Sequence, residues 1–165
     1  MFNKFKFFLT AIATLLAFNS AIAMGHKHST NHHHDSVTID DPWVRSAPPN
    51  APALGAFMNI VNNTHQALKL IKADADGYDR IELHRTQQEG DLMKMVKQAF
   101  MPIPAMDSLL LKPGSWHVML IGPDSVPKEG EKVRISLYFD NGEKQTVSAV
   151  VRKGQKMMHH NHNHH

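Results

Sequence analysis

The sequence predicts an all-β fold, a Greek-key β-sandwich or barrel, and three observations point to it. Short runs along the chain alternate apolar with polar side chains, as half-buried strands do. Nine Pro and nine Gly separate these runs, with turn signals about every 8–12 residues, as in sandwich folds. Asn141-Gly142 between two such runs is typical of a two-residue hairpin. We expect helix to be a minor component.

Five strands are expected in the first half of the folded region. They cover residues 37–39 with 43–45, 55–61, 67–73, 80–86 and 92–96. The first is ended by Pro48-Pro49 and the second by Asn62-Asn63, residues that favour turns. The next two alternate apolar with polar side chains, and a turn over 87–91 leads into the fifth.

Four strands are expected in the second half, over residues 108–111, 116–121, 132–139 and 145–151. Pro113-Gly114 separates the first two, and the Asn-Gly hairpin joins the last two. The segment from Met101 to Met106, with its two prolines, is expected to be a loop.

The first 23 residues have the pattern of a secretory signal peptide. Lys4 and Lys6 precede a 12-residue apolar run over 7–18, and Ala21-Ile22-Ala23 is a small-x-small cleavage site. An uncleaved membrane anchor is the alternative, but a bilayer span needs about 20 residues. We therefore expect cleavage after Ala23, export to the periplasm and no membrane anchoring afterwards.

Composition excludes several classes of site and partner. The 165 residues include 13 His and 10 Met but no Cys, which excludes disulfides, thiolate zinc sites, iron–sulfur clusters and a blue-copper centre. Removing Lys4 and Lys6 with the signal lowers the formal net charge from +3 to +1. Without a basic cluster we expect no nucleic-acid partner.

Histidine is concentrated in two tails. Five residues follow the signal in segment 24–35, namely His26, His28, His32, His33 and His34. Segment 154–165 holds Met157, Met158, His159, His160, His162, His164 and His165. Both tails lack apolar periodicity, so we expect them to be disordered around a folded domain over 36–153. An affinity tag is the alternative for the C-terminal run, but Asn interrupts it and a second cluster exists.

Three histidines remain in the domain, and two of them lie near methionines. His117 and Met119 are two residues apart on an expected strand, so they point to the same face. Met93 and Met95 repeat that spacing, and His84 lies on the preceding strand, where it can be their cross-strand neighbour. Imidazole with soft thioether sulfur selects Cu(I).

The alternative interpretation is structural, because a Met on a strand commonly fills the core. Met58, Met101 and Met106 are interpreted as packing residues, and His65, in a turn after Asn62-Asn63, as a surface residue.

The motif resembles that of the periplasmic copper chaperones of the PCuAC family. His84 is followed after ten residues by Met95, and after twenty-one more by His117-x-Met119. The surrounding residues are also similar over 36–151: Trp43-Val44-Arg45, Pro48-Pro49, Gly55-Ala56-Phe57-Met58, Glu82-Leu83-His84, Met93-Lys94-Met95, Leu111-Lys112-Pro113-Gly114, His117-Val118-Met119-Leu120 and Leu137-Tyr138-Phe139.

The resemblance implies a cupredoxin-like β-barrel that holds one Cu(I) near its surface through His84, Met95, His117 and Met119, with Met93 as a possible substitute. It implies delivery of copper to the Cu(A) centre of cytochrome c oxidase, together with other periplasmic copper chaperones. This chain departs from the family's pattern at Arg85-Thr86 and at Trp116. Arg85 is expected to place a cation near the metal.

The tails are expected to capture additional Cu(II), because clustered neutral imidazoles bind divalent metals and a flexible chain imposes no geometry. In part of the family a His/Met-rich C-terminal extension binds further copper. Tail-bound copper would raise the effective concentration of metal near the barrel site.

The function expected is therefore a non-enzymatic copper chaperone, with a copper buffer or resistance protein as the alternative. No Gly-x-Ser-x-Gly, His-Glu-x-x-His or spaced carboxylate pair points to an enzyme.

Overall fold

The computed structural model describes residues 36–154, and this part of the chain forms ten β-strands and no α-helix. The strands are β1 (Val37–Arg45), β2 (Ala53–Asn62), β3 (Leu68–Asp74), β4 (Tyr78–Glu89), β5 (Leu92–Lys97), β6 (Met101–Ile103), β7 (Ser108–Leu111), β8 (Trp116–Pro123), β9 (Lys132–Phe139) and β10 (Lys144–Arg152). The predicted all-β class is confirmed. The predicted signal peptide and, apart from Gly154, both His-rich tails lie outside the described residues.

Within residues 36–154, no helix is long and apolar enough to cross a membrane.

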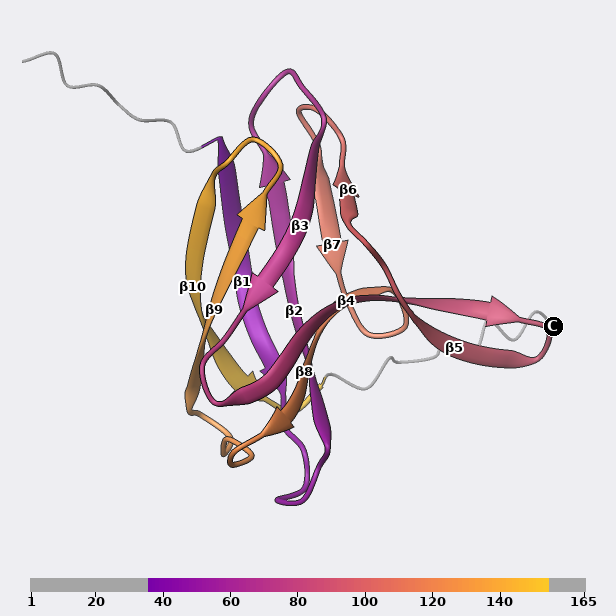
Figure 1. The fold of residues 1–165 in the computed structure, drawn as a ribbon, viewed down its shortest axis with the longest axis vertical. Helices are drawn as coiled ribbons and strands as arrows, with labels where there is room; N and C mark the ends of the chain where they lie inside the picture. The colour runs from indigo at the N-terminus through magenta and orange to yellow at the C-terminus, as the bar shows by residue number, and fades with distance from the viewer. Residues whose placement is uncertain (1–35, 155–165) are drawn as a thin grey trace, which may run out of the picture. The chain divides into compact units, whose positions relative to one another are not determined.

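The strands form one hydrogen-bonded series, in the order β5-β4-β8-β2-β1-β10-β9-β3-β6, which folds back on itself as two layers (Figure 1). The pairing of β1 with β10 is parallel, and the others are antiparallel. β1 pairs with one edge of β2, while along the other edge β8 pairs with the first half of β2 and β7 with the second half.

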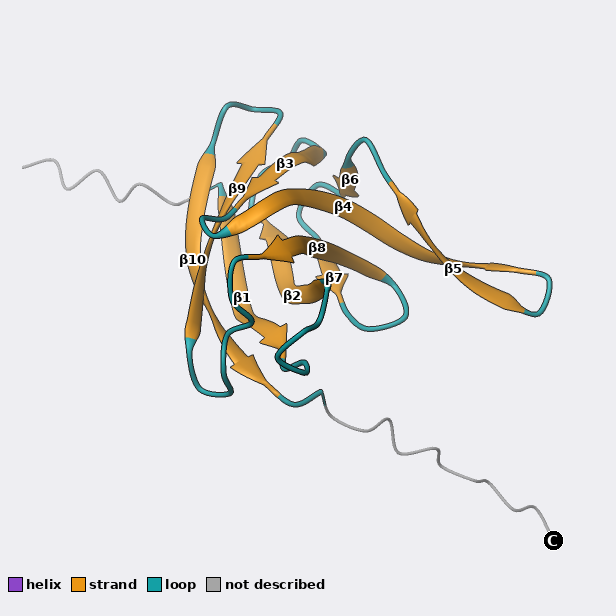
Figure 2. Cartoon of the chain, turned by 60° about the horizontal axis from the view of Figure 1, so that its bottom comes forward, coloured by secondary structure: helices purple, strands orange, loops and turns teal. Residues whose placement is uncertain are grey.

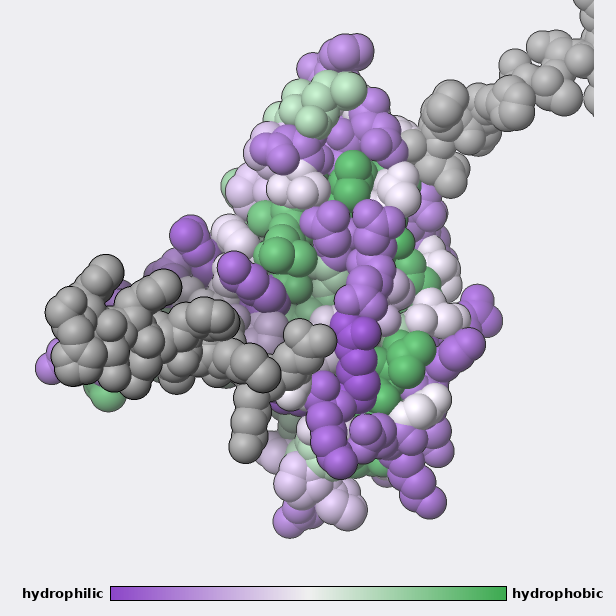
Figure 3. Space-filling model, turned by 180° about the vertical axis from the view of Figure 1, so that it is seen from behind, coloured by the Kyte–Doolittle hydropathy of each residue, from purple (hydrophilic) through white to green (hydrophobic). Residues whose placement is uncertain are grey.

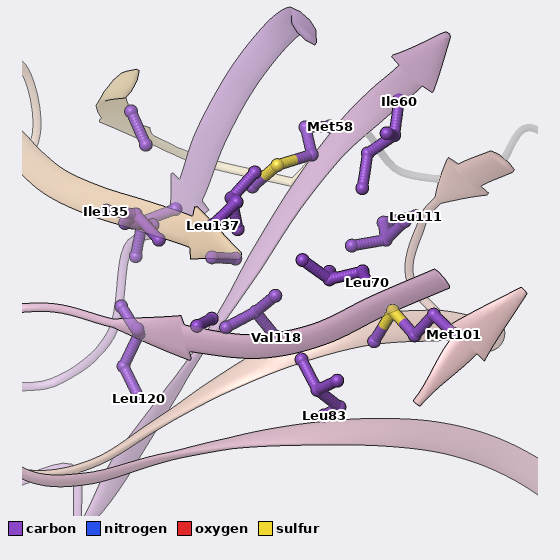
Figure 4. Packing of buried hydrophobic residues seen from close by; sticks show 14 of the residues in the cluster. Met58, Ile60, Leu70, Leu83, Met101, Leu111, Val118, Leu120, Ile135 and Leu137 are labelled. Carbon is purple, nitrogen blue, oxygen red and sulfur yellow. The ribbon is translucent and has the colours of Figure 1, made fainter. Parts of the chain in front are cut away.

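The core lies between the layers and follows the two-residue alternation of the strands. In β9, Val133, Ile135, Leu137 and Phe139 are buried, as the alternation predicted. Leu83 of β4 and Val118 of β8 point into the same cluster, together with Leu70 of β3 and Ile135 (Figure 4). Because Leu83 and Val118 face inward, the residues next to them in sequence face outward.

Two local predictions were wrong. Met101–Ile103 is a short strand, β6, rather than a loop; it pairs with β3 at the end of the series, and Met101 is fully buried. Pro102 is tolerated there because an edge strand does not need every N–H. Met106, predicted to pack, is instead exposed on a turn, with a positive φ of 53°.

The β4–β5 hairpin projects away from the rest of the strands (Figures 1 and 2). β4 continues to Glu89, beyond the predicted end at residue 86, so the turn is shorter than expected. Every residue of β5 is exposed. Seen from behind, the body carries hydrophilic residues around separate apolar patches (Figure 3). The β4–β5 hairpin thus extends beyond the hydrophobic core, and only the part of β4 around Leu83 is packed against that core.

Candidate metal centre

His84 and His117 lie side by side on the outer face of the sheet. They are register partners on the antiparallel strands β4 and β8, and their ring centroids are 5.7 Å apart. His84 follows Leu83, and His117 precedes Val118. Because Leu83 and Val118 face the core, both imidazoles lie on the opposite face of the sheet. The structure thus brings together the two histidines that the sequence singled out, whereas His65 is exposed in a turn.

His117 is held in one tautomer by its own backbone neighbourhood. Its side chain is 3% exposed, and its Nδ1 lies 3.0 Å from the carbonyl oxygen of Ser115. A carbonyl only accepts, so Nδ1 carries the proton and donates. Burial lowers the pKa of His117, and the neighbouring His84 lowers it further, so the neutral ring is favoured. Its Nε2 is buried without a hydrogen-bond partner.

His84 has the opposite arrangement. Its Nε2 lies 2.8 Å from Oε2 of Glu82, and its Nδ1 is buried without a partner. Glu82 is in turn held by Lys97 Nζ at 3.0 Å and Arg80 Nε at 3.3 Å from its other oxygen. The hydrogen bond from His84 and the contact with Lys97 lower the pKa of Glu82 to about 2, so the carboxylate is charged at neutral pH.

Three buried side-chain N or O atoms lack a hydrogen-bond partner in the described part of the chain, and all three belong to this face. They are Nδ1 of His84, Nε2 of His117 and Oγ1 of Thr86. Leaving a buried polar atom unpaired costs about 1–3 kcal/mol. Such a cluster needs an explanation, and a ligand bound by the two imidazole nitrogens would supply one for His84 and His117.

The methionines surround this pair unequally. Met119 is half-buried on β8, opposite both Glu82 and Gly55. Met95 lies on β5 opposite Thr86 and is 60% exposed. His84 is paired with Lys97 rather than with a methionine, so Met95 is its diagonal neighbour across the hairpin.

Met93 lies one further step toward the hairpin tip, opposite Gln88, and is also 60% exposed. Alternation along β5 gives it the same face as Met95. The tail residues Met157, Met158, His159, His160, His162, His164 and His165 lie outside the described part of the chain.

Aromatic rings form the wall of the site on the β2 side. Phe57 lies between Trp43, with ring centroids 4.6 Å apart, and His117, with centroids 6.2 Å apart. A Cβ on Gly55 would come within 2.9 Å of the Phe57 ring, so glycine there lets the ring lie over the strand. No role was predicted for Glu82 or Phe57 from the sequence, although alternation places both on the site's face.

Arg85 does not point toward the imidazoles. It is the neighbour of His84 on β4 and therefore lies on the other face, where its guanidinium is 5.0 Å from the ring of its register partner Trp116. The expectation that Arg85 places a cation near the metal is wrong, because the two-residue period of the strand separates them. The two departures from the family's pattern contact each other instead.

The fold and this face define a class: an all-β domain of cupredoxin-like architecture with paired imidazoles and thioethers on one outer face. The chain belongs to the LpqE-like family ("Putative lipoprotein LpqE-like"), which matches residues 37–151. A relative from Leifsonia xyli subsp. xyli, "Putative lipoprotein Lxx21020", is 28% identical over 120 residues, 72% of this chain and 70% of that protein.

Two solved structures are similar to this chain in fold. The solution structure of Cu(I)-DR1885 from Deinococcus radiodurans is 29% identical, with a TM-score of 0.59 over 78% of this chain and 85% of that one. The copper-bound PCuAC domain from PmoF2 is 18% identical, with a TM-score of 0.63 over 72% of this chain and 94% of that one. The predicted resemblance to the PCuAC family and the predicted fold are confirmed.

Proposed function

We propose that this protein is an exported, periplasmic metallochaperone that carries Cu(I) as cargo on His84, Met95, His117 and Met119 and delivers it to the Cu(A) centre of cytochrome c oxidase. The observation that carries the proposal is the pair of buried, partnerless imidazole nitrogens on rings 5.7 Å apart. Two imidazoles bound to one ion at about 2.0 Å would have centroids roughly 5–6 Å apart. The spacing of the two rings is therefore compatible with both binding one ion.

The donor set favours Cu(I) over harder ions. Met119 and Met95 offer thioether sulfur on the face of the two histidines, and soft ligands of this kind select Cu(I). Among residues 36–154, no three His, Asp or Glu side chains are placed to hold a metal together. The likeness to a Deinococcus protein whose structure was solved with Cu(I) supports the same metal here.

Unequal exposure of the ligands suits capture followed by release. His117 is 3% exposed, whereas Met95 is 60% exposed on β5, an edge strand that pairs only with β4. An incoming ligand of an acceptor can displace the exposed thioether first, while the histidines still hold the ion. Copper would thus pass by ligand exchange, without an enzymatic step.

The C-terminal tail is proposed to collect Cu(II) with Met157, Met158 and the histidines that follow them. The chain leaves β10 at Arg152, which is paired with Arg45 at the end of β1, two residues beyond Trp43. Trp43 and His117 are separated by two strand spacings, about 10 Å. A segment of eleven residues spans at most about 35–40 Å, so metal bound by the tail would be within reach of the barrel site.

The site is tested by competition for Cu(I) with a strong chromogenic chelator. The full chain should hold one tight equivalent, and His117→Ala and Met119→Ala should each lose it while the far-UV spectrum keeps its β signature. His65→Ala, which removes an exposed histidine of the same domain, is the matched control and should bind as tightly as the unmodified chain. Unchanged affinity in the His117 and Met119 variants would refute the assignment.

X-ray absorption of the Cu(I) form counts its neighbours directly. The proposal requires nitrogen and sulfur in comparable number. A spectrum with nitrogen alone would place the metal in the His-rich tails and contradict the barrel site.

Delivery and storage make different predictions in the cell, and the ten tail histidines are the observation that favours storage. Deletion of the gene should lower oxidase activity under copper limitation if the protein delivers copper. Sensitivity only at high copper would instead support sequestration.

A chain ending at Lys153 should bind fewer Cu(II) equivalents than the full chain; equal stoichiometry would refute the role of the C-terminal tail.

A further inference from the structure

The two imidazoles of the site are held by hydrogen bonds of opposite sense. Ser115 accepts from Nδ1 of His117, at 3.0 Å, and leaves Nε2 open. Glu82 accepts from Nε2 of His84, at 2.8 Å, and leaves Nδ1 open. A neutral imidazole has one donor and one acceptor nitrogen, so the partner of one nitrogen decides what the other offers.

We propose that Glu82 is a positioning residue of the copper site: it fixes His84 in the Nε2–H tautomer, so that His84 binds Cu(I) through Nδ1 while His117 binds through Nε2. This inference rests on the proposed function and deepens it. Histidine ligands of metals commonly donate their second N–H to a carboxylate or carbonyl, and loss of that partner typically costs 10–100-fold in metal affinity.

Glu82 is itself immobilised by the sheet around it. It lies two residues before His84 on β4, so both side chains share one face. Lys97, the register partner of His84 on β5, holds the carboxylate from one neighbouring strand, and Met119 is the register partner of Glu82 on the other. The carboxylate is therefore oriented before metal arrives, and its negative charge lies beside a site whose four ligands are neutral.

A merely structural ion pair would predict something different. If Glu82 served only to join β4 and β5 through Lys97, its loss would lower the free energy of unfolding and leave the tautomer of His84 and the affinity for Cu(I) unchanged. The tautomer is therefore the readout that separates the two roles, and it can be measured without copper.

The experiment uses the full apo chain and long-range ¹H–¹⁵N correlation of its imidazoles at neutral pH, with signals assigned by His84→Ala and His117→Ala. We expect His84 as Nε2–H and His117 as Nδ1–H. In Glu82→Ala, His84 should become a mixture of tautomers while His117 is unchanged. Glu82→Gln is the second variant if the alanine variant does not fold, and its amide oxygen should preserve the tautomer in part.

Chelator competition then measures the consequence. Glu82→Ala should weaken Cu(I) binding by about 10–100-fold. Glu89→Ala is the matched control, because Glu89 is also on β4 and pairs with a lysine of β5, Lys94, away from the histidines. An Nδ1–H tautomer for His84 in the unmodified chain, or equal affinity in the Glu82 and Glu89 variants, would overturn the inference. Absence of tight Cu(I) binding in the unmodified chain would refute the proposed function alone.

Discussion

His84 and His117 are register partners on β4 and β8, with their ring centroids 5.7 Å apart on the outer face of the sheet. The pairing depends on register as much as on sequence. A slip of one residue between the strands would turn one of the imidazoles toward the core, because successive side chains alternate between faces. Leu83 and Val118, packed in the core, prevent that slip. The hydrophobic core therefore sets the geometry of the candidate metal site.

The two hairpin methionines allow a direct test of which sulfur is the ligand. Met95 is opposite Thr86 and diagonal to His84, whereas Met93 is a step farther toward the tip of the β4–β5 hairpin. Met95→Ala should weaken Cu(I) binding by about tenfold or more, as loss of one of four ligands, and Met93→Ala should weaken it much less. Both side chains are 60% exposed, so neither change should alter the free energy of unfolding by more than about 0.5 kcal/mol.

Chelator competition and denaturant unfolding provide the two measurements. A larger loss of affinity in Met93→Ala than in Met95→Ala would identify Met93 as the ligand that replaces Met95.

Arg85 should be neutral toward the metal. Its guanidinium stacks on Trp116 on the face opposite His84, so removing its charge changes little at the site. Arg85→Met should keep the Cu(I) affinity within about twofold and should cost the domain about 0.5–1 kcal/mol of lost cation–π contact. Cu(I) affinity that rises tenfold in this variant would show that the charge acts on the site.

The strands and the face that carries the histidines could largely be predicted from the sequence, because side chains alternate with a period of two residues along a strand. Residues 132–139 alternate so regularly that β9 has the predicted bounds, and the i, i+2 spacing of His117 and Met119 correctly places both on one face. The ends of β4 and the existence of β6 depend on tertiary pairing. Pro102 made a strand unexpected, and only its contact with Lys69 of β3 explains it.

The orientation of the histidine rings was not predictable. Glu82 and Ser115 select the open nitrogen of each ring through contacts that no spacing rule fixes. The side of the strand on which Arg85 lies could have been read from alternation, yet its closeness in sequence to His84 suggested the opposite.

Thr86 carries the third partnerless atom on the site's face, and its removal should stabilise the apo domain. Thr86→Val keeps the shape of the side chain but deletes the buried hydroxyl, which avoids a desolvation cost of about 1–3 kcal/mol. We expect the free energy of unfolding to rise by about 1 kcal/mol and the Cu(I) affinity to stay within a few-fold. Thermal unfolding of apo protein and chelator competition measure the two effects. A loss of Cu(I) affinity above tenfold would show that the hydroxyl contributes to the site.

Glu82 should make the stability of the apo protein depend on pH in acid. Its pKa is lowered from an ordinary value of 4.5 to about 2 in the folded chain, by the hydrogen bond from His84 and by Lys97. A carboxyl whose folded pKa is depressed stabilises the native state fully above its unfolded pKa. That stabilisation is lost as pH falls through the folded pKa, because protonation then favours the unfolded chain.

The comparison that isolates this effect is the unmodified chain against Glu82→Gln, since all other carboxyls, including the hydrogen-bonded Glu143, are common to both. The difference in free energy of unfolding between the two should shrink as pH falls from about 4.5 to about 2. Urea unfolding at a series of pH values, in the presence of a chelator that keeps the protein free of metal, measures it. A difference that does not vary over this interval would mean that Glu82 titrates as an ordinary exposed glutamate, and the contacts from His84 and Lys97 would then be absent in solution.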